Sequence, residues 1–406
     1  MRERLAVAFH EGTHRSAVLS DTLARIAPLL PAMGITRAGD ITGLDRIGIP
    51  TWIAVRPAAK LLTVSSGKGL SHGAARVSAL MESVEHWHTE WPAEVFRRTS
   101  TVELMREHSP FLAVHELPDY EPGPYFTDRR VLDWVLSESL PDGTRAWLPA
   151  STAFFTDPML TLWSANGLAS GNHMIEATLH GLYEVIERDS VARLIRGGVS
   201  LPRGQSRVVD LDTLPAGPLT ELRDRLCRAR VGLTLIWVES IVPVTTFWAV
   251  LVDPASPFPS TYVNMGHGSH LCPSVAATRA ITEAAQSRLA FIHGSREDLL
   301  PGAYQFKPSI DRIRTFFTNR RGDLSWSTLV DRSNGDLSVD LDTVLNGLYV
   351  AGYTRVFRVD LTQARFDIPV VKVVVPGLSG LSWSKPGGSR TSTEGTRSGS
   401  ANRGSP

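Results

Sequence analysis

Cysteine is scarce in this chain, which contains only Cys227 and Cys272 among its 406 residues. The two lie far apart and outside any CxxC spacing, so the sequence supports neither a disulfide framework nor a cysteine-ligated zinc cluster. Disulfide-stapled secreted proteins are therefore excluded. We expect the protein to be cytoplasmic.

Long apolar runs are also absent. No segment approaches the roughly 18 uncharged apolar residues that indicate a membrane-spanning helix. The N-terminal MRERLAVAFHEG contains too short an apolar run for a signal peptide. We therefore expect a soluble protein without a membrane partner.

Neither sign of charge is in excess, because 42 Lys and Arg residues balance 41 Asp and Glu residues to leave a net charge of +1. Nucleic acid is not an expected partner, since no basic surplus is available to bind a phosphate backbone. The composition, 42% hydrophobic and 20% charged, is that of a globular protein able to bury a large core.

Strand and helix patterns alternate along the chain, which predicts mixed sheets packed with helices. Outside the motifs below, helices are expected at residues 17–33, 102–107, 219–229 and 341–351. Strands are expected at residues 53–55, 61–65, 131–136, 146–149, 208–211, 233–239, 246–252, 354–360 and 370–375.

The first motif is SSGKGLSHGAARVSALMESVEHWHTEW, residues 65–91, which predicts a glycine-broken loop and one helix with Ser71 as its N-cap. Ser78, Glu82 and Glu85 share a sector roughly 60° wide beside the apolar stripe of this helix. The two glutamates allow two interpretations. They form either a solvated helix edge or a partly buried pair that needs a hard cation such as Mg²⁺.

The second motif is SANGLASGNHMIEATLHGLYEVIERDSVARLIRGG, residues 164–198, which predicts a glycine-rich turn and a helix of about six turns. Glu184, Glu187 and Arg188 lie opposite the apolar stripe of the helix. They therefore form either an exposed, salt-bridged face or part of a site, since glycines before a helix N-terminus allow an anion to approach the backbone.

The third motif is NMGHGSHLCPSVAATRAITEAAQSRLAFIHG, residues 264–294, with Pro273 in the first helical turn. Glu283 and Gln286 share one helix face, whereas Arg288 points elsewhere. His267 and His270 suggest a metal site, but no third ligand follows at suitable spacing. We interpret them as polar turn residues.

Lys68 lies between two glycines, yet the surrounding residues do not form a P-loop. Leu62 stands where that motif needs glycine, and Gly69 replaces its Ser or Thr. Ser65 and Lys68 match the S-x-x-K of penicillin-recognising enzymes, but no SDN or KTG accompanies them. Both interpretations are rejected.

Taken together and in this order, the three motifs resemble the signatures of the YcaO family, and the resemblance extends over about residues 36–376. It implies an α+β fold in which mixed β-sheets and helices surround a central ATP and Mg²⁺ site. The expected catalytic domain covers residues 1–382. Residues 383–406 form a low-complexity tail too poor in apolar residues to order itself.

YcaO proteins hold ATP through Mg²⁺ on glutamates rather than through a P-loop, and no protein nucleophile is expected. His86 departs from the family pattern, because many members have Arg there. The implied metal ligands are Glu82, Glu85, Glu184 and Glu187. The implied ATP contacts are Lys68, Ser78, Glu82, Arg188, Glu283, Gln286 and Arg288.

The resemblance also implies the reaction, which is phosphorylation of a backbone amide oxygen in a peptide or protein substrate. Azoline-forming members commonly end in PxPxP, whereas this chain has a lone Pro406. The segments ITRAGDITGLDRIGIP and IPVVKVVVPGL are similar to members that form thioamides with a TfuA partner. We therefore expect thioamide formation with a TfuA-like partner and a sulfide source.

Two alternatives stay open. The protein is an azoline-forming cyclodehydratase, which needs a leader-binding module from another chain, or a non-catalytic scaffold whose glutamates form salt bridges. The sequence also allows a homodimer.

Overall fold

The computed structural model describes residues 4–92, 96–118, 120, 126–156, 163–196, 205–253, 255–256, 258–299, 301–305 and 322–380. The expected tail, residues 383–406, lies outside these ranges, as does the end of the expected catalytic domain. None of the helices described is both long and apolar enough to cross a lipid bilayer.

The described strands form three sheets. The first has the order β1-β2-β3, made of β1 (Arg37–Asp40), β2 (Thr51–Val55) and β3 (Val64–Lys68). The second has the order β11-β10-β9-β8, made of β8 (Ser206–Val208), β9 (Gly232–Val238), β10 (Thr245–Val252) and β11 (Val263–His270).

The third sheet has the order β4-β5-β12-β13-β7, and β6 pairs with β5. Its strands are β4 (Arg97–Ser100), β5 (Val131–Ser139), β6 (Arg145–Pro149), β7 (Leu168–Ser170), β12 (Phe357–Asp360) and β13 (Val370–Val374). All pairings between the named strands are antiparallel. The alternation of helices and strands in the sequence predicted sheets of mixed pairing instead. The reason is that the long helices connect different sheets rather than neighbouring strands of one sheet.

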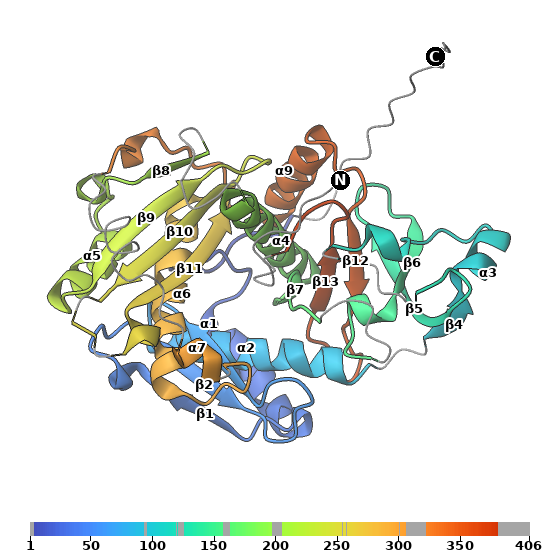
Figure 1. Cartoon of the computed structure of the whole chain (residues 1–406), viewed down its shortest axis with the longest axis horizontal. Helices are drawn as coiled ribbons and strands as arrows, with labels where there is room; N and C mark the ends of the chain where they lie inside the picture. The colour runs from blue at the N-terminus through green and yellow to red at the C-terminus, as the bar shows by residue number, and fades with distance from the viewer. Residues whose placement is uncertain are drawn as a thin grey trace, which may run out of the picture.

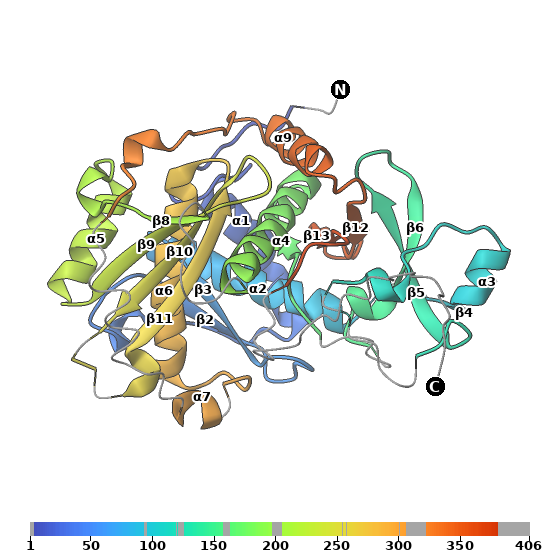
Figure 2. The same cartoon turned by 45° about the horizontal axis from the view of Figure 1, so that its top comes forward.

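Three long helices each cover one sheet (Figures 1 and 2). Helix α2 (His72–Glu90) packs on β2 and β3, α4 (Met174–Arg196) on β7 and β13, and α6 (Pro273–His293) on β10 and β11. The other described helices are α1 (Leu19–Ile26), α3 (Thr101–Arg106), α5 (Pro218–Arg228), α7 (Pro301–Gln305) and α9 (Leu337–Val350). The predicted α+β class is confirmed.

The glycines before two of the long helices lie in strands rather than in loops. A Cβ on Gly67 in β3 would lie 2.0 Å from the backbone N of Ala79 in α2. A Cβ on Gly266 in β11 would lie 2.2 Å from the backbone N of Ala284 in α6. The predicted glycine loop is therefore wrong at Gly67, and the interpretation of His267 and His270 as polar turn residues is wrong because both lie in β11. Glycine is needed here because the helix backbone packs directly on the strand.

Helix α2 begins as predicted, since the Ser71 hydroxyl accepts a hydrogen bond from the Ala74 N–H at 3.2 Å. Of the two interpretations of α4, the exposed, salt-bridged face does not hold, because Glu176, Glu187 and Asp189 are all buried. The reason is that α4 packs against α9 and β11 in addition to its own sheet. In both views it lies between the four-stranded and six-stranded sheets.

Candidate functional site

Helices α2, α4 and α6 meet around a cavity of about 550 Å³. A cavity of this size is typical of small-molecule sites. Every predicted site residue except one lines it, from three helices and β3: Lys68, Ser78, Glu82, Glu85, Glu184, Glu187, Arg188, Glu283 and Gln286. The exception is Arg288.

The α2 carboxylates lie one helical turn apart on the cavity wall. Burial, together with the nearby charges of Glu82 and Glu184, raises the pKa of Glu85 to about 8, although two hydrogen bonds favour the charged form. Those bonds come from the backbone N–H and hydroxyl of Ser170, at 2.8 and 2.6 Å, and join α2 to β7. Burial also raises the pKa of Glu82.

The α4 pair repeats this arrangement from the opposite side. Burial raises the pKa of Glu184 to about 7, because the charge of Arg188 offsets burial only in part and the charge of Glu187 adds to it. The Arg188 Nε atom lies 3.8 Å from Glu187 Oε1. Although burial opposes it, the carboxylates of Glu187, Glu283 and Glu184 raise the pKa of Arg188, which stays charged.

Helix α6 contributes one further carboxylate, that of Glu283, and this one is paired. Glu283 Oε2 lies 2.7 Å from Lys68 Nζ, while Glu283 Oε1 accepts the His267 backbone N–H at 3.2 Å. Burial alone would raise the pKa of Glu283, but the Lys68 ammonium holds it well below its usual range. Gln286 donates to the Ser66 carbonyl at 2.7 Å, which anchors α6 to β3 beside Lys68.

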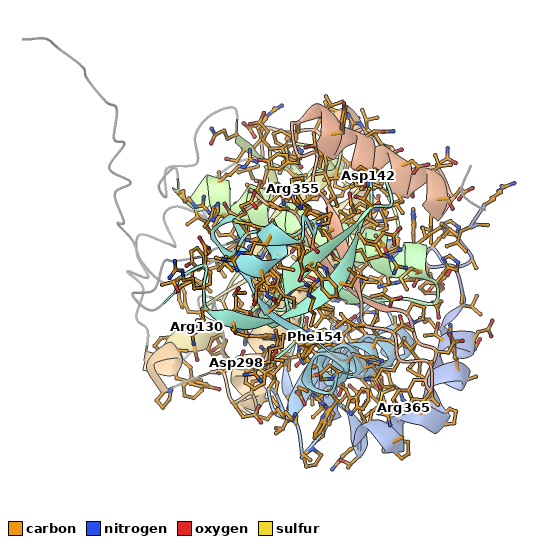
Figure 3. All side chains as sticks on the ribbon, turned by 90° about the vertical axis from the view of Figure 1, so that its right-hand side faces the viewer. Arg130, Asp142, Phe154, Asp298, Arg355 and Arg365 are labelled. Carbon is orange, nitrogen blue, oxygen red and sulfur yellow. The ribbon has the colours of Figure 1, made fainter. Side chains whose placement is uncertain are left out.

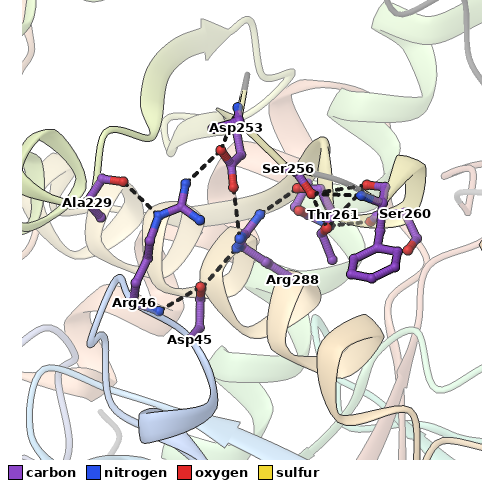
Figure 4. A network of polar contacts seen from close by, with 11 residues as sticks. Asp45, Arg46, Ala229, Asp253, Ser256, Ser260, Thr261 and Arg288 are labelled. Atoms are coloured by element: carbon purple, nitrogen blue, oxygen red, sulfur yellow. Dashed lines mark hydrogen bonds and ion pairs between the residues drawn. The ribbon is translucent and has the colours of Figure 1, made fainter.

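Arg288 does not line the cavity and belongs instead to the polar network drawn in Figure 4. Its side chain is 5% exposed and lies in an ion-pair network, with Nε 3.0 Å from Asp45 Oδ2 and Nη2 2.9 Å from Asp253 Oδ2. A further N–H donates to the Thr261 carbonyl, and Arg46 also pairs with Asp253 at 2.7 Å. Each of the three guanidinium nitrogens contacts an acceptor in this network. Arg288 is therefore separate from the cavity that the other expected ATP contacts line.

The Arg288→Gln variant is expected to lower the free energy of unfolding by about 3 kcal/mol, because it leaves buried Asp45 without its partner. Denaturant unfolding measures this loss. The folded variant should bind MgATP with wild-type affinity. A large loss of affinity at unchanged stability would return Arg288 to the nucleotide site.

A second cavity, of about 640 Å³, lies between Arg46 and α5. The described residues that line it include four arginines and no carboxylate: Arg46, Arg225, Arg228 and Arg230. The described lining of this cavity therefore lacks carboxylate ligands for a metal.

Three residues that were not among the predicted site residues also line the cavity. Arg15, from the N-terminal segment, lines the cavity and pairs with Glu176 at 3.2 Å. Arg279 donates to the His180 ring at 3.0 Å, and both also line the cavity. Only the tertiary fold brings Arg15 to the site, because the N-terminal segment follows no motif pattern, whereas His180 and Arg279 lie on the motif helices α4 and α6.

The departure at His86 has a structural counterpart. Burial lowers the pKa of His86 to about 4, so the ring is neutral at pH 7. Arg296, which follows α6, lines the cavity beside Glu82 and His86. Two N–H groups of Arg296 donate to Asp298, at 3.0 and 2.6 Å, and Asp298 is labelled in Figure 3. A cation from outside the three motifs thus lies near His86, the position at which many members of the resembled family have Arg.

These donors fit Mg²⁺ and a polyphosphate. Carboxylate oxygens are the ligands that Mg²⁺ prefers, and burial, with the neighbouring carboxylates, raises the pKa values of Glu85 and Glu184, so that a cation would stabilise their charged forms. Lys68 and Arg188 supply cations of the kind that bind phosphate. Glu82, Glu85, Glu184 and Glu187 are the residues that would hold the metal.

Binding of preformed MgATP near pH 7 is expected to release about one proton per site, because the metal displaces protons from Glu85 and Glu184. Calorimetry in buffers of different ionisation enthalpy measures the release. It should shrink in Glu85→Gln. Proton uptake, or no exchange, would contradict the assignment of these carboxyls as metal ligands.

Comparison with known proteins gives an independent result. A model of the family described as YcaO cyclodehydratase, ATP- and Mg²⁺-binding, matches residues 66–379. An uncharacterized protein of Methanothermobacter thermautotrophicus is 34% identical over 372 residues, which cover 88% of this chain and 93% of the relative. An uncharacterized protein of Rhizobium leguminosarum bv. trifolii, described by its position in the tfuA 3′ region, is 31% identical over 376 residues. The match covers 90% of this chain and 88% of that relative.

A solved structure is also similar, that of YcaO from Methanopyrus kandleri bound with AMPPCP and Mg²⁺. The TM-score is 0.74 at 27% sequence identity, over 95% of this chain and 100% of that one. The family model covers most of the chain, and the three motif helices surround one carboxylate-rich cavity. The chain therefore belongs to the YcaO family of ATP-dependent, Mg²⁺-binding enzymes that modify peptides.

Proposed function

We propose that this protein phosphorylates a backbone amide oxygen of a peptide or protein substrate with ATP and converts that amide to a thioamide. A TfuA-like partner and a sulfide source take part. Because the reaction consumes ATP, we place it in the cytoplasm. The observation that carries the proposal is the meeting of the carboxylates of α2, α4 and α6 with Lys68 and Arg188 at one cavity.

The chemistry explains why such a site needs charges rather than a nucleophile. Amide resonance, reflected in a rotational barrier of about 18–20 kcal/mol, makes the carbonyl carbon a poor electrophile. Phosphoryl transfer to the amide oxygen removes this protection. Catalysis of that transfer consists mainly of positioning and charge neutralisation. Mg²⁺ on the four glutamates would supply part of the neutralisation, and Lys68 and Arg188 the rest.

The proposed reaction balances without a further oxidant or reductant. The amide oxygen attacks the γ-phosphorus, and the bond from that phosphorus to ADP breaks. Hydrosulfide adds to the amide carbon, and the carbon–oxygen bond breaks as phosphate leaves with the former amide oxygen. The proton of hydrosulfide ends on phosphate, so the products are a thioamide, ADP and hydrogen phosphate.

Thioamide formation is supported by the relative from the tfuA 3′ region, which matches nearly the whole chain. The second candidate is azoline formation, in which a Cys, Ser or Thr side chain of the substrate adds to the activated carbon. The description of the family model as a cyclodehydratase favours it. Both candidates use the same activation step and differ in the nucleophile.

Reconstitution distinguishes the two. The protein is combined with candidate peptide, TfuA-like partner, ATP and sulfide, and the peptide is analysed by mass spectrometry. We expect the mass change of replacing oxygen by sulfur, dependent on sulfide and absent with Glu184→Gln. Loss of water without a sulfide requirement would replace the thioamide proposal by azoline formation, and no ATP consumption with any peptide would favour the scaffold.

A further inference from the structure

The cavity of about 640 Å³ beside the C-terminal end of α5 is separate from the site described above. None of its described lining residues also lines the cavity between α2, α4 and α6. We propose that it binds an acidic segment of a peptide or protein partner, whose carboxylates pair with its four arginines. This binding does not depend on the proposed function. We call it the arginine cavity, after Arg46, Arg225, Arg228 and Arg230.

The arginine cavity has a surplus of positive charge. The ion-pair network in Figure 4 contains two carboxylates and two guanidinium groups, so it neutralises only one lining arginine, Arg46. No carboxylate of the described residues forms an ion pair with the other three, which are Arg225, Arg228 and Arg230. Three positive charges therefore line one concave surface without a partner of opposite charge in the described part of the chain.

The structure of α5 does not account for this surplus. The helix dipole places about half a negative charge at the C-terminal end, which a single arginine would more than offset. The acidic residues of α5 are occupied or distant, since Asp224 pairs with Arg223 and Glu221 lies in the first turn. The surplus charge is therefore available to an anionic ligand.

Two of the guanidinium groups are held in place by backbone carbonyls. Arg46 Nε donates to the Ala229 carbonyl at 2.9 Å, and Arg225 Nη1 donates to the Gly48 carbonyl at 2.7 Å. A guanidinium group has five N–H donors, so each arginine keeps donors for a ligand. Because the side chains are already oriented, less conformational entropy is lost when those donors bind a carboxylate.

Arg230 has a backbone conformation that favours glycine. Its φ is 55°, in the left-handed region, and it follows the end of α5. The Val231 N–H donates to the Leu226 carbonyl at 3.0 Å, which closes the helix end in the manner that usually places glycine at this position. Strained non-glycine residues are concentrated at functional sites. The side chain at the arginine cavity gives a reason for arginine here.

The lining favours an acidic peptide over other anions. Guanidinium groups bind carboxylates through two parallel hydrogen bonds. The described lining contains no aromatic ring on which a nucleobase could stack. A nucleic acid backbone also needs a longer basic track, and the chain has a net charge of only +1. The remaining described lining is apolar or small and suits the methylene groups of Asp and Glu side chains: Ile47, Gly48, Ala229 and Ala255.

Fluorescence anisotropy with the full-length protein and a labelled hexaglutamate peptide at low ionic strength tests the proposal. The wild type should bind hexaglutamate but not hexaglutamine. The double variant Arg228→Gln/Arg230→Gln should weaken hexaglutamate binding at least tenfold. The matched control is Arg129→Gln/Arg130→Gln, which removes the same charge from exposed positions immediately before β5 and should keep the wild-type affinity.

The Arg230→Gly variant separates binding from folding. Glycine relieves the left-handed backbone, so the melting temperature should rise while hexaglutamate binding weakens severalfold. Wild-type affinity in Arg230→Gly or in the double variant would overturn the proposal. Failure of the wild type to bind hexaglutamate, or an equal loss of affinity in the control, would also overturn it. Tighter binding of oligodeoxythymidylate than of hexaglutamate, lost in the double variant, would replace the acidic segment by nucleic acid.

Discussion

Replacing Glu184 with glutamine is expected to lower the affinity for MgATP about 100-fold or more, and Glu82→Gln should have the same effect. Each substitution keeps the size of the side chain and removes the charge that would hold the metal between α2 and α4. Even outer-shell changes at metal sites cost about 10–100-fold, so loss of a direct ligand should exceed that range. Calorimetric titration with ATP and Mg²⁺ measures the affinity. Glu221→Gln, on the exposed face of α5, is the control.

Glu85 is expected to make the free energy of unfolding of the metal-free protein depend on pH. The folded-state pKa of Glu85 is about 8 against an ordinary 4.5, so between about pH 5 and 8 the folded metal-free protein binds a proton that the unfolded chain does not. Its stability therefore falls as the pH rises through this window. Glu85→Gln should lack this part of the decrease.

For the calorimetric titrations, wild-type MgATP affinity in both Glu82→Gln and Glu184→Gln would remove the support for the metal assignment.

The Lys68→Met variant is expected to lower ATP turnover about 100-fold, the usual effect of removing one preorganised donor at a developing charge. Methionine keeps most of the length of the lysine side chain but lacks the ammonium group, which lies 2.7 Å from Glu283 in the wild type. Steady-state phosphate release measures the loss. The control is Lys60→Met, because the Lys60 ammonium lies over the Trp91 ring and donates to the Glu90 carbonyl, outside the cavity.

Turnover at the wild-type rate in Lys68→Met would show that Lys68 only ties β3 to α6. A fall in stability with unchanged turnover would lead to the same conclusion. The combination that supports the assignment is lost turnover in a protein that melts at the wild-type temperature.

Local spacing predicted the parts of the site that lie on single helices. The i, i+4 and i+7 positions of Ser78, Glu82 and Glu85 place all three on the cavity wall, and the same periodicity turned Arg288 away from Glu283. Such predictions succeed because helix geometry relates residues within two turns whatever surrounds the helix.

The predictions were wrong where the structural role of a residue depends on which element packs against it. Gly67 suggested a loop, but the role of Gly67 and Gly266 is to let a helix backbone lie on a strand, which no local pattern encodes. The charged face of α4 was open to a solvated interpretation because the sequence does not show that Glu184, Glu187 and Arg188 face the cavity between the three long helices.

The remaining site residues are distant from one another in the sequence and meet only in the folded protein. His267 had no third ligand at suitable spacing along the chain, yet a carboxylate oxygen of Glu187, 80 positions earlier, lies within 4.8 Å of a ring nitrogen of His267. Arg15 and Arg296 reach the cavity from segments outside the motifs. Their place in the site follows from how the three sheets are assembled.

The fate of the amide oxygen tests the central claim most directly. A substrate peptide carrying ¹⁸O at the modified backbone carbonyl is turned over with ATP, and the released phosphate is analysed by mass spectrometry. Activation by O-phosphorylation predicts one ¹⁸O atom in each phosphate formed with modified peptide, whether the product is a thioamide or an azoline. Phosphate free of ¹⁸O, formed in step with modified peptide, would contradict amide activation at this site.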